Sequence, residues 1–288
     1  MTLPAFDLVQ PASLDEALEA LGAGAESKPI SGGTSLLVNL RDERETAEQL
    51  VDLTRVAELR GIEDRGHELK IGAGNLIADL MACPLVEPNV PILVEAAKTF
   101  ASPLVRNRAT VGGNLVDASP AADTAPPLLA LGAVVDLTSA QGTRTLPLEE
   151  FFVGVRKTAI RPDEIMTAVR IPAAREGTLT AYHKLGLRKA DAISVISVAV
   201  CVTVADGICH EARIALGAVA PTPFVAKEAS EALSGSALTS ETIASAAALA
   251  AKACRPIDDV RASAEYRRRT VETLVRRVLT EIAEGGTQ

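Results

Sequence analysis

Two glycine doublets, each beside hydroxyl side chains, have the residue types and spacing best suited to ligand binding in this chain. Gly32-Gly33 lies within residues 31–36, and Gly112-Gly113 lies within residues 110–114. Adjacent glycines permit positive φ and let the backbone approach a ligand closely. Successive N–H groups in such a loop form a nest for an anion, and neighbouring hydroxyls add donors. Tight turns also favour Gly-Gly, but two such loops predict a ligand with two phosphates, a dinucleotide.

The charge and composition of the chain limit what else it can bind. The net charge is −8 over 288 residues, which argues against a nucleic-acid partner. Aromatic residues make up only 2% of the chain and there is no Trp, so a flat cofactor ring is expected to lie mainly against aliphatic side chains. Backbone amides and hydroxyls, rather than many lysines, are therefore expected to hold a diphosphate.

The four cysteines and three histidines show neither metal-ligand spacing nor pairing with a nucleophile. We therefore predict reduced thiols, no metal site and no catalytic residues in this chain. No uninterrupted apolar stretch reaches the about 20 residues of a membrane span, and the N-terminus lacks the basic start and apolar run of a signal peptide. The expected protein is cytoplasmic, with no membrane span.

The elements that position the two doublets follow from residue patterning. Ser13, with Glu16 three residues later, predicts an N-capped helix over 13–21. A polar join at 173–177 divides the chain, which predicts an α+β fold in two parts. Further helices are expected over 36–40, 78–83 and 91–98, and strands over 49–53, 68–74, 133–137, 143–146, 164–172, 193–205 and 211–218. The strands over 133–137 and 143–146 are expected to pair as a hairpin through residues 140–142.

The last predicted helix runs over residues 258–284. Helical spacing places six of its apolar residues on one face: Val271, Leu274, Val275, Val278, Leu279 and Ile282. The arginine clusters 267–269 and 276–277 are expected on a solvated or partner-facing side of this helix.

Several motifs together resemble a known family. They are Gly-Gly-Thr-Ser-Leu-Leu at 32–37, Val-Arg-Asn-Arg-Ala-Thr-Val-Gly-Gly-Asn at 105–114, Ser-Pro-Ala-Ala-Asp at 119–123, Tyr-His-Lys-Leu at 182–185 and Ala-Leu-Gly-Ala-Val-Ala-Pro-Thr-Pro at 215–223. In this order, across most of the chain, they resemble the flavin subunit of molybdenum hydroxylases, which includes the carbon monoxide dehydrogenase medium subunit and the xanthine dehydrogenase FAD domain.

The resemblance implies a two-subdomain FAD-binding domain of the vanillyl-alcohol-oxidase (PCMH) type over residues 1–175, with subdomains at about 1–56 and 57–175. A smaller C-terminal α+β domain would follow over residues 178–285. FAD would lie extended between the subdomains, its diphosphate on the two glycine loops. A side chain added at Gly112 would then enter the diphosphate's place.

The resemblance also implies roles for individual residues. Asp123 would accept a hydrogen bond from a ribityl or ribose hydroxyl, and Lys184 would lie near the flavin pyrimidine edge, where a cation favours the anionic reduced flavin. The implied cofactor-binding residues are Ser31, Gly32, Gly33, Thr34, Ser35, Leu36, Thr110, Val111, Gly112, Gly113, Asn114, Ser119, Asp123 and Lys184.

Structural alternatives remain open at four of the notable positions. Asp123 could instead cap a helix that begins near Thr124, and Lys184 could be a solvated strand residue. Arg106 and Arg108 could form surface ion pairs rather than contact a ligand. The sequence also lacks the inserted four-cysteine loop found in the 4-hydroxybenzoyl-CoA reductase branch of the family.

The function implied is that of an FAD-carrying electron-transfer subunit in a heteromeric molybdenum hydroxylase. Its partners would be a large subunit with the molybdenum cofactor and a small subunit with two 2Fe-2S clusters. Electrons would pass from those clusters to FAD and then to an external acceptor: NAD, a quinone or another carrier. The alternatives are a self-contained flavin oxidoreductase of the same fold and a cofactor-free interaction subunit.

Overall fold

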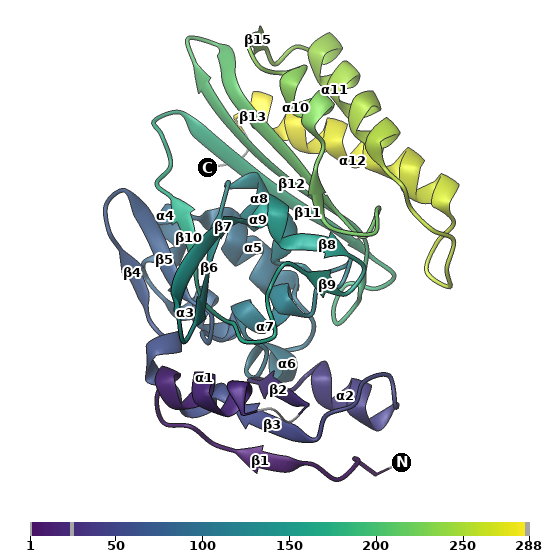
Figure 1. The fold of residues 1–288 in the computed structure, drawn as a ribbon. Helices are drawn as coiled ribbons and strands as arrows, with labels where there is room; N and C mark the ends of the chain where they lie inside the picture. Colours follow the sequence, from purple (N-terminus) through teal and green to yellow (C-terminus); the bar gives the residue numbers. More distant parts are fainter. Residues whose placement is uncertain (1, 24–25, 286–288) are drawn as a thin grey trace.

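A computed structural model describes residues 2–23 and 26–285, and in it the chain forms three units, each built around a β-sheet (Figure 1). The units follow one another along the chain, from the purple N-terminal unit to the green and yellow C-terminal one. The mixed α+β architecture that the sequence predicts is confirmed.

The N-terminal unit is a three-stranded parallel sheet in the order β1-β3-β2. Ser13 caps α1 as predicted, its Oγ accepting from the Glu16 N–H at 3.2 Å. The loop that carries Gly32-Gly33 joins β2 to α2. The elements of this unit are β1 (Asp7–Val9), α1 (Leu14–Gly22), β2 (Ser27–Ile30), α2 (Leu36–Arg41), β3 (Gln49–Asp52), η1 (Leu53–Arg55) and η2 (Ala57–Leu59).

The middle unit is a five-stranded antiparallel sheet in the order β4-β5-β10-β6-β7, with helices packed around it. The predicted hairpin is confirmed as the β6–β7 pair, and Pro91 occupies the first turn of α5. The elements are β4 (Ile62–Asp64), β5 (Glu68–Gly72), α3 (Ile77–Ala82), α4 (Val86–Asn89), α5 (Pro91–Thr99), α6 (Pro103–Arg106), α7 (Val111–Val116), α8 (Ala125–Ala130), β6 (Val134–Ser139), β7 (Gly142–Pro147), α9 (Leu148–Phe151), β8 (Phe152–Gly154), β9 (Lys157–Thr158) and β10 (Ile165–Pro172).

The C-terminal unit is an antiparallel sheet whose main strands run in the order β11-β12-β13-β14. Helices α10, α11 and α12 lie to one side of it in Figure 1. The elements are β11 (Thr178–Gly186), β12 (Ser194–Ala205), β13 (Ile208–Gly217), β14 (Phe224–Val225), α10 (Lys227–Glu231), β15 (Ser236–Ala237), α11 (Ser240–Ala253) and α12 (Ala264–Ala283).

Both faces of this C-terminal sheet are buried. Val198 and Val200 of β12 pack with the C-terminal helices, whereas Ala199 between them packs into the core of the middle unit, where α5 and α8 lie. Successive strand residues point to opposite faces, so a strand covered on both sides reads as an almost continuous apolar run. The C-terminal unit is therefore joined to the middle unit through the sheet itself.

Helix α12 begins later than the sequence predicts. Ser263 caps it by accepting from the Tyr266 N–H at 3.1 Å, and residues 258–262 form a turn around Asp259 instead of a first helical turn. The predicted apolar face from Val271 to Ile282 is confirmed, because all six of its residues are buried.

Arg267 contradicts the predicted solvated side of this helix. It is only 2% exposed, its Nη2 lies 2.6 Å from Asp259 Oδ1, and its Nη1 donates to the Ala218 carbonyl at 2.8 Å. The reason is helical spacing, since residue 267 precedes buried Val271 by four positions and shares its face. Arg268 and Arg269 are exposed as predicted.

In the part of the chain that the structure describes, no helix is both long and apolar enough to cross a membrane.

Replacing Arg267 with Met should lower the free energy of unfolding by about 2 kcal/mol or more, because a partly buried carboxylate and a buried carbonyl lose charged donors. Arg268→Met, one position along on the exposed side, should change it by less than about 0.5 kcal/mol. Urea denaturation of both variants measures the difference. Equal losses would contradict the buried placement of Arg267.

Candidate cofactor-binding site

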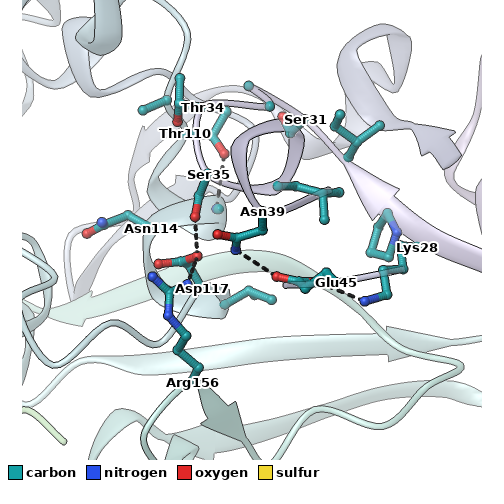
Figure 2. Close-up of a pocket in the computed structure, with 18 of the residues that line it drawn as sticks. Lys28, Ser31, Thr34, Ser35, Asn39, Glu45, Thr110, Asn114, Asp117 and Arg156 are labelled. Atoms are coloured by element: carbon teal, nitrogen blue, oxygen red, sulfur yellow. Dashed lines mark hydrogen bonds and ion pairs between the residues drawn. The ribbon is translucent and has the colours of Figure 1, made fainter. Parts of the chain in front are cut away.

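A cavity of about 520 Å³, called the cleft below, opens between the N-terminal and middle units (Figure 2). The two predicted glycine motifs meet here: one from the β2–α2 loop and one from the start of α7. The predicted residues that line the cleft are Ser31, Gly32, Gly33, Thr34, Ser35, Leu36, Thr110, Gly113 and Asn114. The structure thus brings together nine of the fourteen predicted residues, from segments about 80 positions apart.

The first glycine motif supplies free donors. In the described chain, the backbone N–H groups of residues 32–36 have no hydrogen-bond acceptor, although the next one, at Leu37, donates to the Gly33 carbonyl at 3.3 Å. Gly33 has a φ of 70°, in the left-handed region that glycine adopts without strain. Five successive unpaired amides lining a cavity are suited to hold a group with several anionic oxygens.

The second glycine motif differs from the prediction of a second amide nest. It forms the first turn of α7, and its amides already donate within the chain. The Gly112 N–H donates to the Ala73 carbonyl at 2.8 Å, and the Gly113 N–H donates to Thr110 Oγ1 at 3.0 Å. The prediction of a second amide nest is therefore wrong, because the Ala73 carbonyl and the Thr110 cap already satisfy these amides.

The role predicted for Gly112 is also corrected by the structure. A Cβ at this position would lie 2.7 Å from the Ala73 Cβ and 2.9 Å from its carbonyl oxygen. A side chain there would meet the segment after β5, not the cleft. Gly32 is similarly constrained, since its Cβ would lie 2.0 Å from the Arg108 carbonyl oxygen. Both glycines allow two backbone segments to lie in direct contact. At Gly32 the contact joins the N-terminal unit to the middle unit.

Asn114 is the polar side chain of α7 best placed to donate into the cleft. Its Oδ1 accepts from Thr124 Oγ1 at 2.7 Å and from the Thr124 N–H at 3.3 Å. These bonds fix which end of the amide is Nδ2. Nδ2 has no acceptor within the described chain, so its two hydrogens are available to a ligand.

Two carboxylates in the cleft, which the sequence did not predict, are each neutralised by a neighbouring cation (Figure 2). Asp117 accepts from Ser35 Oγ at 2.5 Å and from Arg156 Nη1 at 2.8 Å. Glu45 accepts from Lys28 Nζ and Asn39 Nδ2, both at 2.8 Å.

Each carboxylate is thereby matched with a cation. Burial favours a higher pKa for Glu45, but the hydrogen bonds from Lys28 and Asn39 and the charges of Lys28 and Arg156 outweigh it and hold the pKa below its usual range. An anionic ligand thus meets little net repulsion. Asp117 follows Asn114 by three positions, so helical spacing could have predicted that it faces the same ligand. No sequence pattern connects Lys28, Glu45 or Arg156 with the glycine motifs.

A smaller cavity of about 90 Å³, called the side pocket, shares Ser31, Thr110 and Gly113 with the cleft. Its wall is mainly aliphatic: Leu53, Leu59, Ile165 and Met166. Gly112 lines this pocket, whereas the predicted residue Val111 is fully buried in the core. The aliphatic wall fits the expectation that a ring lies against such side chains.

Asp123 and Lys184 form a buried ion pair where the middle and C-terminal units meet. Lys184 Nζ lies 2.6 Å from Asp123 Oδ2 and donates to the Thr99 carbonyl at 2.9 Å. Ser194 Oγ donates to Asp123 Oδ1 at 2.6 Å. Burial raises the pKa of Asp123, and the Lys184 charge and the two hydrogen bonds oppose that rise.

This pair settles two open alternatives. Asp123 does not cap α8, because the N-cap is Thr124 and no side chain makes a cap hydrogen bond there, and the Lys184 side chain is only 6% exposed. Neither residue lines the cleft itself, but Phe100, which follows Thr99, does. Ser119 also lies outside the cleft wall, with its Oγ accepting from the Ala121 N–H.

Arg106 has a structural role that the sequence alternatives did not include. Its Nη1 donates to the Phe100 carbonyl at 2.7 Å and so gives a hydrogen-bond donor to a carbonyl just after the end of α5. All four cysteines are free, and no group of three or more His, Cys, Asp or Glu side chains in the described residues could hold a metal ion.

Comparison with known protein families gives two matches that together span most of the chain. Residues 4–174 match the FAD binding domain in molybdopterin dehydrogenase. Residues 180–282 match the CO dehydrogenase flavoprotein C-terminal domain.

Individual relatives agree. The chain is 36% identical to the carbon monoxide dehydrogenase medium chain of Hydrogenophaga pseudoflava, covering 97% of each protein. It is 33% identical to the nicotine 6-hydroxylase medium subunit of Paenarthrobacter nicotinovorans, covering 98% of each. Its structure superposes on carbon monoxide dehydrogenase from Hydrogenophaga pseudoflava with a TM-score of 0.96 over 100% of both chains, at 36% identity. Quinoline 2-oxidoreductase from Pseudomonas putida 86 gives 0.93, at 31% identity over 99% of both chains.

Gly112→Ala should destabilise the protein without any ligand by about 1–3 kcal/mol, because the new methyl group overpacks against Ala73. Gly22→Ala is the matched control, since a Cβ there has nothing within 4 Å. Thermal unfolding of the cofactor-free proteins measures both. An unchanged melting temperature for Gly112→Ala would show that the space beside Ala73 is not limiting.

Proposed function

Because this chain belongs to the FAD-binding subunits of the molybdenum hydroxylase family, we propose that it is the electron-transfer subunit of a heteromeric complex. Its partners would be a large molybdenum-cofactor subunit and a small iron–sulfur subunit. The single observation that carries the cofactor assignment is the run of unpaired backbone amides at residues 32–36 in a cleft between two units. We propose residues 1–175 as the FAD-binding domain and 178–285 as the C-terminal domain.

The chain's residues hold the diphosphate in an asymmetric way in this proposal. Free amides of residues 32–36 donate from one side. Asn114 Nδ2 donates from the other, while Thr110 is used to cap α7 and leaves no nest there. Hydrogen bonds from neutral groups to a phosphate are charge-assisted and therefore stronger than neutral pairs. This supports binding without many lysines, in agreement with the acidic composition.

The two ends of the site favour opposite ends of FAD. Phe100 lines the cleft next to Thr99, whose carbonyl binds Lys184. We therefore place the flavin ring toward Phe100 and Lys184, and the adenine in the aliphatic side pocket. Lys184 then supplies a positive charge near the ring, and Asp123 supplies the carboxylate that holds this lysine in place.

FAD held by residues 32–36 and Asn114 would supply the redox chemistry that links the 2Fe-2S clusters of the partner to an external acceptor such as NAD or a quinone. The chain's own residues bind, orient and electrostatically tune it. Hydroxylation of substrate belongs to the molybdenum subunit in this proposal. A cytoplasmic location agrees with four free cysteines, which suit a reducing compartment.

The proposal predicts three results for the purified protein. The chain alone should bind one FAD and turn yellow, should not turn over a hydroxylase substrate, and should support turnover once combined with the two partner subunits. Absorption spectra and dye-reduction assays measure these outcomes. Turnover by the chain alone would favour a self-contained flavin oxidoreductase, and a colourless active complex would favour a cofactor-free interaction subunit.

Asn114→Asp tests the diphosphate contact with almost no change of shape. The carboxylate can still accept from Thr124, but it presents a negative charge where Nδ2 donated. FAD should bind at least about tenfold more weakly, a loss of about 1.4 kcal/mol. Titration of the apoprotein with FAD, followed by flavin fluorescence, measures the change.

Asn89→Asp in α4 is the control for the added charge, since Asn89 bonds only to the Leu85 carbonyl and lies outside the cleft. It should bind FAD like the unmodified chain. If Asn114→Asp also retained full affinity, the phosphate would not lie against α7.

A further inference from the structure

A continuous chain of polar contacts runs from helix α12 to the buried Asp123–Lys184 pair. It passes through the turn at residues 258–262 and the first residue of strand β12, and it is called the junction network below. Its side chains come from the middle unit and from four parts of the C-terminal unit: β11, β12, the turn and α12. Its members are Arg267, Asp259, Arg261, Ser194, Asp123 and Lys184.

Asp259 is the centre of the C-terminal half of the network. Arg261 Nη2 and Arg267 Nη2 each lie 2.6 Å from one of its two carboxylate oxygens, and the Arg261 N–H also donates to it at 2.8 Å. Burial opposes ionisation, but the bonds from the two arginines outweigh it and hold the pKa of Asp259 well below its usual range. The turn is therefore fixed in one geometry by charge-assisted bonds.

Ser194 joins this turn to the ion pair. Its carbonyl accepts from Arg261 Nη1 at 3.2 Å, while its hydroxyl donates to Asp123 Oδ1 at 2.6 Å. The residue is fully buried at the start of β12, so no water competes for the hydroxyl. The other Asp123 oxygen, Oδ2, binds Lys184. The bond from Ser194 to Oδ1 therefore fixes the orientation of the carboxylate plane relative to Lys184.

We propose that Ser194, held in place by Arg261, is a positioning residue that fixes Asp123 on Lys184 and so sets how strongly this ammonium favours reduced flavin. The inference rests on the proposed FAD site. It assigns the C-terminal domain a part in tuning the cofactor, through residues that do not line the cleft.

The physical reason is the low polarity around the pair. Charges interact strongly where water is excluded, so a small change in how well Asp123 neutralises Lys184 changes the field that a nearby ring experiences. Removing the Ser194 hydroxyl takes a donor from a buried carboxylate, which weakens its anionic form. Lys184 is then less neutralised, and the anionic reduced flavin is stabilised relative to the oxidised form.

Ser194→Ala in the FAD-loaded full-length chain tests this directly. The ratio of affinities for reduced and oxidised flavin should rise about tenfold, which raises the two-electron midpoint potential by about 30 mV. Dye-equilibrated redox titration at fixed pH measures the potential. Ser197→Ala is the matched control, because Ser197 is equally buried on the same strand and its Oγ donates to neither residue of the ion pair. Its potential should be unchanged.

Arg261→Gln tests the other end of the connection and does not touch the buried core. Arg261→Gln should shift the midpoint potential in the same direction as Ser194→Ala, but by less. The control is Arg276→Gln, which breaks only an exposed ion pair with Glu272 and should leave the potential unchanged. Because both network changes act through Asp123, the double variant should match Ser194→Ala rather than the sum of the two.

Two outcomes would overturn the inference. One is a potential for Ser194→Ala equal to that of Ser197→Ala. The other, which applies even if Ser194→Ala does not fold, is an unshifted potential for Arg261→Gln. Failure of the proposed function looks different, because the unmodified chain would then take up no FAD and no potential could be measured.

Discussion

Five consecutive backbone N–H groups, at residues 32–36, have no acceptor in the described chain, and the cleft is built around them. Backbone donors are almost always paired in folded proteins, so a run of unpaired ones at a cavity indicates a place for water or for an anionic ligand. The close approach of Gly32 to the Arg108 carbonyl keeps this loop against the middle unit. Because residue 32 has no side chain, the β2–α2 loop and the segment before α7 touch directly at the wall of the cleft.

The C-terminal unit packs against the middle unit and supplies Lys184 of the buried ion pair. Its sheet is buried on both faces, and the middle unit supplies one of the two coverings. That packing brings Lys184 of β11 and Ser194 of β12 onto Asp123, next to the segment that carries Phe100. In our proposal, binding of the cofactor and its electrostatic tuning are therefore separate tasks. Amides in the cleft would do the first, and a buried ion pair between the middle and C-terminal units would do the second.

Much of this could be predicted from the sequence, and the failures have physical causes. Local signals sufficed for the Ser13 cap, the β6–β7 hairpin and the apolar face of α12. Nine of the fourteen residues that the family motifs imply line the cleft. The second nest was predicted wrongly because the Ala73 carbonyl takes the Gly112 amide and the Thr110 cap of α7 takes the Gly113 amide. Glu45 and Arg156 were missed because only tertiary packing brings them to the cleft.

Amide hydrogen exchange with and without FAD tests the central claim most directly. If the free amides of residues 32–36 hold the diphosphate, FAD should slow their exchange strongly. The amides of Gly112 and Gly113, which already donate to the Ala73 carbonyl and to Thr110 Oγ1, should change much less. Unchanged exchange at residues 32–36 in a chain that has bound FAD would contradict the account, and so would slowing confined to α7.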